Sequence, residues 1–341
     1  MKLIGIETSC DETAVAVVED GRVIHSNVIA TQSEMHAKFG GIVPEIASRQ
    51  HLLTILPVVK MALGSAGVEI WQMDGVAVTH GPGLAGSLLV GVNAAKGLAI
   101  SHDLQLIGVN HLEGHIYAAW LDSEDPELNP GFPLMCLIAS GGHTDLILME
   151  GHGQFKLVGR TRDDAAGEAF DKGARVLGLG FPGGPEIQKV ALGSLGEEPK
   201  MPRPNIKDSL DFSFSGLKTS LLRRVESRGW YPPNEECQPD VSEVAQVAAA
   251  FQEAIVDTMV SRTLEAVREY QVMGVVLGGG VASNALLRKE FDRRSPVKVI
   301  VPEPRLCTDN GAMVGSAAWF HLRHGTSHQW DLDVMPSLRL G

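Results

Sequence analysis

Two stretches of the sequence share one pattern: residues 3–18 read LIGIETSCDETAVAVV and residues 134–149 read LMCLIASGGHTDLILM. In each stretch, aliphatic residues precede a short polar turn and a second aliphatic run follows it, which is typical of a β-hairpin. The turns carry Ser, Thr and Gly, and their backbone N–H groups can converge on an anion. The pattern predicts two related hairpins, with two unrelated hairpins as the alternative because such turns are common.

A third glycine-rich turn lies near the C-terminal end, where residues 275–284 read VVLGGGVASN. The pattern is a buried strand, three glycines and the start of a helix, so that a ligand can approach the backbone and an anion is favoured at the helix N-terminus. The order of the three turns resembles the actin, sugar-kinase and heat-shock ATPase superfamily. This resemblance implies an α/β fold with two duplicated mixed-sheet halves around a central cleft.

Hydrophobic periodicity supports an α/β fold, because strand-like runs alternate with helical patterns along the chain. Strands are expected at Leu3–Glu7, Ala14–Glu19, Val23–Val28, Gly75–Thr79, Leu106–Asn110, Leu134–Ala139, Asp145–Met149, Met273–Leu277 and Val297–Val301. Helices are expected at Ser48–Leu63, Ser87–Ser101, Val244–Tyr270 and Ala282–Arg294.

The length of 341 residues is enough for about two domains. We expect an N-terminal lobe of residues 1–127, to which a C-terminal helix of residues 310–341 returns. A C-terminal lobe would comprise residues 128–309. Residues 185–241 are rich in Pro, Gly and charge, and they are expected to form an insertion in that second lobe.

Composition excludes several classes of protein. Apolar residues make up 44% of the chain and charged residues 21%, which indicates a folded protein. No apolar run reaches the roughly 18 residues of a membrane span, and the four cysteines are too scattered for a disulfide framework or zinc ribbon. The sequence therefore predicts a cytoplasmic protein without a membrane anchor.

The formal net charge of −12 argues against strong unaided binding to nucleic acid. Two local basic patches are candidates for such contacts, with an ordinary solvated helix face as the alternative for each. The first comprises Lys218, Arg223, Arg224 and Arg228, and the second comprises Arg288, Lys289, Arg293 and Arg294. For the second patch the solvated face is the preferred interpretation.

The sequence HLEGH at residues 111–115 is a candidate metal site. If a helix begins there, His111 and His115 share one face and can bind the same ion. Glu113 lies about 200° round the helix from His111, unlike the glutamate of a zinc protease, so a metalloprotease is disfavoured. Capping or surface histidines are the alternative.

A third ligand has to come from elsewhere, and Asp309 in the stretch CTDNG is the candidate. Its alternative role is the N-cap of the apolar helix that follows. Two histidines and a carboxylate suit Fe(II), Zn(II) or Mn(II), and the sequence does not choose among them.

Three further stretches have open interpretations. Residues 81–86 read GPGLAG, which we interpret as a close strand-to-helix turn, with dinucleotide binding as the weaker alternative. Asp164, Glu168 and Asp171 share a helical face that is either solvated or suited to sugar hydroxyls. The polar stretch Met35–His51 is either an exposed loop or the lip of a cleft.

A set of motifs in a fixed order resembles the TsaD family, the tRNA adenosine threonylcarbamoyltransferases once called O-sialoglycoprotein endopeptidases. The motifs are IETSCDET at 6–13, HLEGH at 111–115, SGGHT at 140–144, GEAFDK at 167–172, FPGGP at 181–185, DFSFSGLK at 211–218 and CTDNG at 307–311. They span nearly the whole chain. Leu112 replaces a methionine that is common in the family's histidine motif.

The resemblance implies a transferase that moves the threonylcarbamoyl group of threonylcarbamoyl-adenylate to the exocyclic amine of the adenosine 3′ of the anticodon, releasing AMP. It implies one divalent metal per chain, usually described as iron, on His111, His115 and Asp309. The adenine nucleotide would be held by Ile138, Ala139, Ser140, Gly141, Gly142, Asp171, Gly184 and Asn284. Glu186 stands where many members carry Asp, so its ribose contact is less certain. Asp11 and Glu12 are candidates for catalysis.

The resemblance also implies partners. These are tRNA, a catalytically inactive paralogue and a small ATPase, with a separate synthase that supplies the adenylate. A rival interpretation from another class is a nucleotide-dependent regulatory ATPase of the actin-like superfamily. Cys10 is the only thiol near the proposed reacting centre, and we interpret it as a packing residue.

Overall fold

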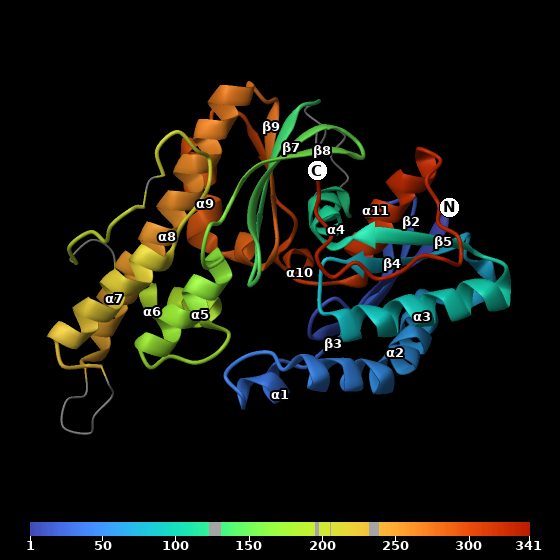
Figure 1. Ribbon diagram of the computed structural model, residues 1–341, viewed down its shortest axis with the longest axis horizontal. Helices are drawn as coiled ribbons and strands as arrows, with labels where there is room; N and C mark the ends of the chain where they lie inside the picture. The colour runs from blue at the N-terminus through green and yellow to red at the C-terminus, as the bar shows by residue number, and fades with distance from the viewer. Residues whose placement is uncertain (123–130, 195–197, 205, 232–238) are drawn as a thin grey trace. The chain divides into compact units, whose positions relative to one another are not determined.

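The computed structural model describes residues 1–122, 131–194, 198–204, 206–231 and 239–341 (Figure 1). Cys237 and part of the expected insertion lie outside these residues. The chain forms two compact units. Unit 1 comprises Met1–Pro130, Gly151–Phe155 and Pro302–Gly341, and unit 2 comprises Gly131–Glu150 and Lys156–Val301.

Unit 1 is built on a five-stranded mixed sheet with the order β3-β2-β1-β4-β5. The strands β1, β2 and β3 pair antiparallel, whereas β4 and β5 run parallel to β1. Their bounds are β1 Lys2–Glu7, β2 Glu12–Glu19, β3 Val23–Thr31, β4 Gly75–Gly81 and β5 Gln105–Asn110. Buried valine, isoleucine and alanine side chains of these strands form the core of the unit.

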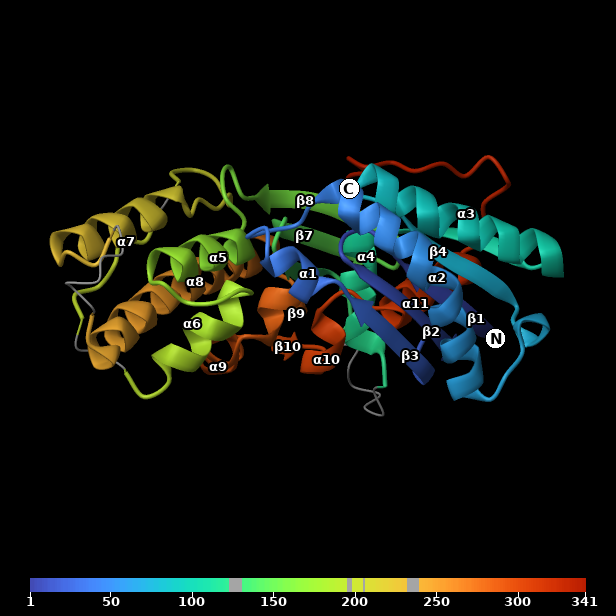
Figure 2. The same ribbon diagram turned by 90° about the horizontal axis from the view of Figure 1, so that it is seen from below.

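Helices cover both faces of this sheet. The long helices α2 (Pro44–Ala66) and α3 (Ala85–His102) lie side by side along one face, and the short helix α1 (Ser33–Ala37) precedes α2 (Figure 2). The helices α4 (His111–Tyr117) and α11 (Gly311–Arg323) pack together on the other face, where α11 crosses β1 (Figure 1). The short α10 (Pro304–Cys307) leads into α11.

Glycines allow α11 to approach the sheet closely. A Cβ atom on Gly5 of β1 would lie 2.2 Å from the backbone oxygen of Gly311, and one on Gly311 would lie 2.5 Å from the backbone nitrogen of Ala16. Any larger side chain would push the helix away from the sheet. This contact fixes the segment just before α11, which carries Asp309.

Unit 2 contains a second five-stranded sheet with the order β10-β9-β6-β7-β8. Its strands are β6 Leu134–Ala139, β7 Thr144–Gly151, β8 Gln154–Arg160, β9 Gly274–Gly278 and β10 Lys298–Ile300. Its helices are α5 Ala166–Val176, α6 Gly183–Ala191, α7 Ser215–Ser227, α8 Val241–Tyr270 and α9 Ala285–Arg294. The helix α8 begins at Asp240, whose side chain accepts a hydrogen bond from the N–H of Ser242, and it supplies much of the buried apolar surface of the unit.

The two sheets have the same topology. In both, a hairpin is antiparallel (β1–β2 and β6–β7), and two later strands are added parallel to the first strand of that hairpin. The predicted α/β fold with duplicated mixed-sheet halves is therefore confirmed. Each predicted strand and helix corresponds to an observed element.

Several details differ from the expectations. Helices α6 and α7 were not among the expected helices. The strand β8 was not expected either, since its polar and apolar residues alternate over residues 154–157 only and most of its side chains are exposed or half-buried. The helix α9 begins at Ala285 and not at Ala282, because Asn284 caps it after a short 3₁₀ turn. The last helix, α11, ends at Arg323, where Gly325 with φ of 74° follows, so it does not extend to residue 341.

No helix in the described part of the chain is both long and apolar enough to cross a membrane.

Candidate functional site

His111, His115 and Asp309 come together in unit 1. Helix α4 follows β5 directly, because the Asn110 side chain accepts a hydrogen bond from the N–H of Leu112 and so caps the helix. The two histidines then lie one turn apart on the same face. The Nε2 atoms of His115 and His111 lie 3.2 and 3.6 Å from Oδ1 of Asp309. All three side chains offer a ligand atom within 4.8 Å of the others.

The alternative role of Asp309 as a helix cap is taken by its neighbour. Asn310 is fully buried, and its side chain accepts a hydrogen bond from the N–H of Met313 at the start of α11. The carboxylate of Asp309 therefore does not cap the helix and faces the histidines instead. It is about one-fifth exposed, whereas His115 is almost completely buried.

The buried carboxylate of Glu7 orients the ring of His111 by contacting its Nδ1 atom. Oε2 of Glu7 lies 3.1 Å from Nδ1 of His111, and the same oxygen accepts a hydrogen bond from the hydroxyl of Thr79 at 2.6 Å. Oε1 of Glu7 accepts the N–H of Ser9 at 2.5 Å, and the Ser9 hydroxyl also lies 3.1 Å from Nδ1 of His111. Because Nδ1 is engaged on this side, Nε2 is presented to Asp309. Carboxylate–histidine pairs of this kind are characteristic of metal-ligating histidines.

The donor set fits a divalent metal ion. Nδ1 of His115 is buried and lacks a hydrogen-bond partner among the described residues, and Nε2 faces the Asp309 carboxylate at 3.2 Å without a well-aligned hydrogen bond. Buried nitrogens in this state are costly unless something else binds them. Burial opposes a charge on His111, yet Asp309 and Glu7 outweigh that effect and raise the pKa of His111 to about 9. A cluster that holds a proton this strongly also attracts a cation. The cluster could therefore bind a metal ion.

Glu113 points away from this cluster, as the helical spacing predicts. Its Oε1 atom lies 2.8 Å from Nε2 of His321 on α11, and its side chain is 5% exposed. A zinc protease requires its glutamate beside the metal. The arrangement of α4 therefore does not support a metalloprotease.

The turn between β1 and β2 carries the candidate residues Asp11 and Glu12. Burial, together with the charges of Asp309 and Asp11, raises the pKa of Glu12 to about 9. Burial and the same acidic surroundings raise the pKa of the Cys10 thiol well above its usual range. A thiol in this state is a poor nucleophile, so covalent catalysis through Cys10 is not supported.

Neighbouring elements hold this turn in place. His51 of α2 is fully buried; its Nε2 lies 3.0 Å from the carbonyl oxygen of Cys10, and its Nδ1 lies 2.7 Å from the Thr13 hydroxyl. The turn at residues 81–86 packs against Ser9, because a Cβ atom on Gly83 would lie 2.6 Å from the Ser9 carbonyl oxygen. Residues 81–86 thus form the expected close turn. His36 and His51 are buried, so the stretch Met35–His51 is not simply an exposed loop.

In unit 2, the turn between β6 and β7 is glycine-rich and open. Ile138 and Ala139 end the buried strand β6, and the N–H of Ser140 bonds the carbonyl oxygen of His143. Gly141 and Gly142 are exposed, and a Cβ atom on either would meet nothing within 4 Å. No hydrogen bond recorded for the described residues uses their two N–H groups. The turn can therefore offer backbone donors to an anion.

Other glycine-rich segments of unit 2 border this turn. The N–H of Gly167, at the start of α5, bonds the Ser140 carbonyl oxygen, and a Cβ atom on Gly279 would lie 2.4 Å from the Ala139 carbonyl oxygen. The three glycine-rich segments are therefore neighbours in space.

The remaining residues of the expected nucleotide set lie on α5, α6 and α9. Oδ1 of Asp171 accepts the N–H of Gly183 at 2.7 Å, and Gly184 follows in the first turn of α6 with the half-buried Glu186. Burial raises the pKa of Asp171. The Asn284 side chain caps α9 and also donates to Oε1 of Gln252 at 2.9 Å.

Ion pairs engage most of the predicted charged patches. Asp164 and Glu168 bind Lys172 at 2.6 and 2.8 Å, so this acidic face is largely neutralised. In the first basic patch, Lys218 pairs with Asp164, and Arg224 and Arg228 pair with Glu198. In the second, Arg293 pairs with Glu290 and Arg294 with Asp257. Arg223 and Lys289 are exposed.

Four supporting residues were not anticipated: Glu7, Ser9, His51 and Thr79. The sequence does indicate a special role for Glu7, since a carboxylate at the end of an otherwise aliphatic strand is unusual and needs a buried partner. The others are common polar residues whose partners are distant in sequence.

Comparisons with known proteins agree with the fold. The chain is similar to HypF from T. kodakarensis, with a TM-score of 0.62 and 14% identity over 95% of this chain and 48% of that chain. It is also similar to an activator of 2-hydroxyisocaproyl-CoA dehydratase from Clostridium difficile, with a TM-score of 0.53 and 14% identity over 95% and 97% of the two chains. The fold and the site together define a two-sheet α/β protein, with the fold of these structures and a candidate metal centre.

Sequence comparison is more specific. The family model described as tRNA N6-adenosine threonylcarbamoyltransferase, TsaD, matches residues 23–316. Proteins of that name from Dehalococcoides mccartyi and Clostridium perfringens are 52% and 48% identical, over 99% of this chain and 99% and 98% of their own lengths. The chain belongs to the TsaD family of tRNA-modifying transferases.

Proposed function

We propose that the protein transfers the threonylcarbamoyl group from threonylcarbamoyl-adenylate to the exocyclic amine of the adenosine 3′ of the anticodon, in tRNAs that read codons beginning with A, and releases AMP. The observation that carries this proposal is the near full-length identity of about half the residues to transferases of that name. The buried cluster of His111, His115 and Asp309 is consistent with it.

In this proposal the metal is one divalent ion per chain, Fe(II) in preference to Zn(II), held by His111, His115 and Asp309. When bound, such an ion supplies Lewis-acid polarisation of a phosphate or carbonyl oxygen. Glu7 holds the ring of His111 in the orientation that presents Nε2, and the cap at Asn310 leaves the Asp309 carboxylate available.

The adenine nucleotide is proposed to bind unit 2. The exposed N–H groups of Gly141 and Gly142 would donate to phosphate oxygens, and Ile138, Ala139 and Ser140 shape the strand end that carries them. Asp171 and Gly184, which the Asp171–Gly183 hydrogen bond brings together, would contact the ribose side, with Glu186 in the same turn of α6. Asn284 would lie beside the adenosine and keep the start of α9 in place.

Asp11 and Glu12 are the proposed catalytic residues. A mixed anhydride of a carbamate and a phosphate is already activated, so the protein mainly orients the two substrates and handles the proton of the attacking amine. Glu12 is the better candidate to accept that proton, because a cation held by Asp309 would lower its pKa from the raised value that burial and its acidic neighbours give it, and so would favour the carboxylate form. Asp11 contributes to that shift by its charge.

The proposed partners are tRNA, an inactive paralogue and a small ATPase, all in the cytoplasm, with a separate synthase that makes the adenylate. The net charge of −12 and the ion-paired basic patches support a need for other subunits in tRNA binding. On α2, the side chains of Leu52, Leu53, Leu56 and Met61 are 58–71% exposed. We propose that this apolar face binds the paralogue.

The rival function, a regulatory ATPase, predicts nucleotide turnover that does not depend on tRNA. The deciding experiment is nucleoside analysis of tRNA after incubation with threonine, bicarbonate, ATP and the partner proteins. The modified nucleoside should disappear when this protein is omitted. If the nucleoside forms equally without it, the proposed transfer is wrong.

A further inference from the structure

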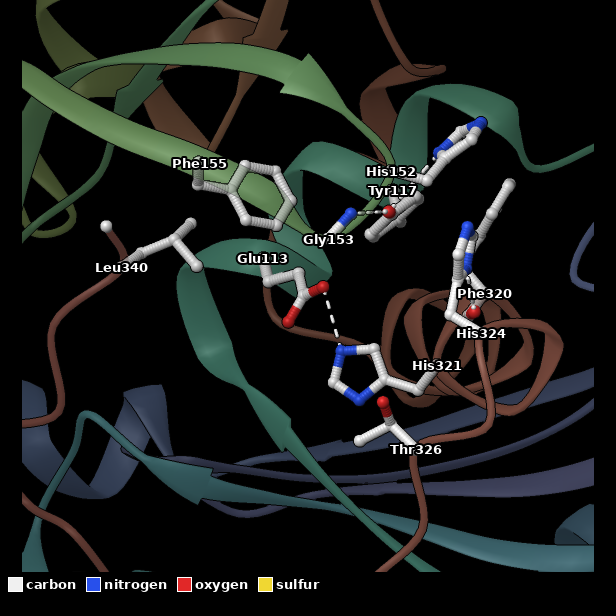
Figure 3. Close-up of a pocket in the computed structure, with 11 residues that line it drawn as sticks. Glu113, Tyr117, His152, Gly153, Phe155, Phe320, His321, His324, Thr326 and Leu340 are labelled. Carbon is white, nitrogen blue, oxygen red and sulfur yellow. Dashed lines mark hydrogen bonds and ion pairs between the residues drawn. The ribbon is translucent and has the colours of Figure 1, made fainter.

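A pocket of about 460 Å³ lies in unit 1 beside Glu113 and Tyr117 of α4 (Figure 3). Both residues are on the side of α4 that faces away from His111 and His115. The pocket is bordered by α4, α11, the segment between β7 and β8, and the C-terminal segment. Its volume is in the lower part of the range of roughly 300–1,000 Å³ that is usual for small-molecule sites. The residues that it contains have no part in the proposed transfer.

Flat rings form most of the wall. They are the aromatic rings of Tyr117, Phe155 and Phe320 and the imidazoles of His152, His321 and His324. The rings of Tyr117 and Phe320 stack at 4.4 Å, and those of His152 and Phe320 at 4.1 Å, so this part of the wall is rigid. The ring of Phe155 meets that of Tyr117 edge-to-face at 6.4 Å, so these rings continue the same wall (Figure 3). A wall of flat rings favours a planar ligand that packs by offset or edge contacts.

The charges in the pocket favour an uncharged ligand. None of its described lining residues is Lys or Arg, so an anion would have no full positive charge to pair with. The single acidic side chain in the lining, Glu113, is already paired with His321 at 2.8 Å. Burial lowers the pKa of His152 to about 4, so this imidazole is neutral near pH 7.

The hydrogen-bonding atoms in the pocket lining favour a ligand that carries a hydrogen-bond donor. Oε1 of Glu113 is bonded to His321, and no bond among the described residues reaches its other oxygen (Figure 3). The Tyr117 hydroxyl is already engaged with Gly153 and His152. The carboxylate oxygen of Glu113 is therefore the strongest side-chain acceptor left in the pocket.

We propose that this pocket is a second small-molecule site, which binds an uncharged planar aromatic compound of one or two rings that carries an N–H or O–H donor. The donor bonds Glu113 and the rings pack against the aromatic wall formed by Phe155, Tyr117 and Phe320. The site is distinct from the nucleotide residues, which belong to unit 2. It is also distinct from the metal cluster, which occupies the other face of α4.

The experiment uses the purified full chain and two fluorinated probes observed by ¹⁹F NMR. The first probe is 5-fluoroindole, which has an N–H donor, and the second is its N-methyl analogue, which has none. We expect 5-fluoroindole to bind saturably with a dissociation constant of about a millimolar, as is usual for a fragment of this size. The N-methyl analogue should bind about fivefold more weakly, because it cannot bond the carboxylate.

Three variants locate the binding. Glu113→Gln should weaken 5-fluoroindole by about three- to tenfold and leave its N-methyl analogue unchanged, because only the charged acceptor is lost. Thr326→Trp should abolish binding of both probes, since Thr326 is an exposed lining residue whose replacement fills the pocket without disturbing the core. The matched control Glu45→Gln removes an exposed carboxylate on α2 and should change nothing.

Several results would overturn the proposal. These are the absence of saturable binding, equal affinity for the two probes, an unaltered affinity in Thr326→Trp, or displacement of 5-fluoroindole by ADP. The last result would place the probe in the nucleotide site. None of these readouts depends on transfer to tRNA, so the proposed function and this site can fail separately.

Discussion

The hairpins β1–β2 and β6–β7 occupy the same position in two sheets of the same topology, yet their turns are chemically opposite. In the first hairpin the last pair is Glu7 with Ala14, and the six residues between them include Asp11 and Glu12. In the second the last pair is Ala139 with Thr144, and the four residues between them include two exposed glycines. One turn presents half-buried carboxylates and the other presents backbone N–H groups.

The difference shows how a duplicated topology can carry two kinds of binding chemistry. The carboxylates and imidazoles of unit 1 create negative potential, which is the environment that the proposed metal ion requires. The glycine N–H groups of unit 2 carry partial positive charge, which is the environment that the proposed phosphate requires. The topology supplies two equivalent strand ends, and a few side chains decide which charge each end attracts.

The largest expected effect comes from removing both histidines of the proposed metal site. The double variant His111→Ala, His115→Ala leaves only Asp309 of the three proposed ligands, so metal content should fall from about one per chain to near zero. Transfer to tRNA should fall with it by more than about 100-fold. Metal is measured by elemental analysis of the purified chain.

The control for this variant is His25→Ala, His102→Ala, which removes two histidines outside the cluster. It should keep both metal and transfer. Unchanged metal content in the His111, His115 double variant would show that the cluster is not the metal site.

Replacing one carboxylate of the first turn should affect the chemistry alone. Glu12→Gln keeps the shape of the side chain but cannot accept a proton, so transfer should slow by roughly 100- to 10,000-fold. Single-turnover transfer from preformed threonylcarbamoyl-adenylate measures this step without any contribution from ATP hydrolysis. Metal content and nucleotide affinity should stay the same.

Glu19→Gln, at the other end of β2, is the matched control because Glu19 pairs with His25 outside the site. Full transfer by Asp11→Asn, Glu12→Gln would remove both residues from the mechanism.

Much of this comparison could be predicted from the sequence, and the part that could not has a physical reason. The hairpins are visible because aliphatic alternation depends only on local order, and HLEGH reveals a shared face because helical spacing is also local. The choice between Asp309 and Asn310 as helix cap is not local, since both residue types cap helices equally well. It is decided by the close packing of α11 on Gly5.

The role of Glu7 was hidden for the same reason. Its partners Thr79 and His111 are 72 and 104 residues away, and only the pairing of β1 with β4 and of β4 with β5 brings them together. The strand β8 was missed because its alternation covers only residues 154–157 and most of its side chains are exposed or half-buried, so the apolar signal is short.

A larger side chain in the turn between β6 and β7 should impair nucleotide binding without disturbing the fold. A Cβ atom on Gly141 meets no atom within 4 Å, and its φ is not in the left-handed region, so Gly141→Val fits the backbone. The new side chain would occupy the space that a phosphate needs beside the N–H groups. We expect ADP affinity to fall by about 100-fold, equivalent to losing one or two charge-assisted hydrogen bonds.

Isothermal titration with ADP measures this effect, and Gly97→Val, at an open position on α3, is the control. Normal ADP affinity in Gly141→Val would exclude this turn from the nucleotide site.

Replacing Glu7, which contacts Nδ1 of His111, should reduce metal affinity, but by less than the loss of the two histidines. Glu7→Gln places an amide against the N–H of Ser9 or the hydroxyl of Thr79, so the ring of His111 loses its fixed orientation. Metal affinity should fall by about 10- to 100-fold, as measured by competition with a chelator. Glu113 lies between the two histidines in sequence, but its side chain bonds His321. The variant Glu113→Gln should therefore leave metal affinity unchanged. Equal effects of the two variants would assign Glu7 a general structural role.

The smallest expected effect concerns stability and the second residue pair from the turn in each hairpin. Asp145 faces Ile138 in the second hairpin, at the position that Val15 occupies opposite Ile6 in the first. Asp145 is 9% exposed, and burial, opposed by the charge of Arg160, raises its pKa to about 6.

A raised carboxyl pKa means that the folded chain binds more protons than the unfolded chain between about pH 4 and 6, so stability falls as the pH rises through that range. Asp145→Asn imitates the protonated form and should raise the free energy of unfolding at pH 8 by about 1–3 kcal/mol. The difference from the unmodified chain should vanish below about pH 4, where Asp145 is protonated in both states. Urea unfolding at both pH values provides the measurement. A gain of the same size at both pH values would mean that the charge of Asp145 is not responsible, and a loss at pH 8 would mean that the carboxylate is stabilised in the folded chain.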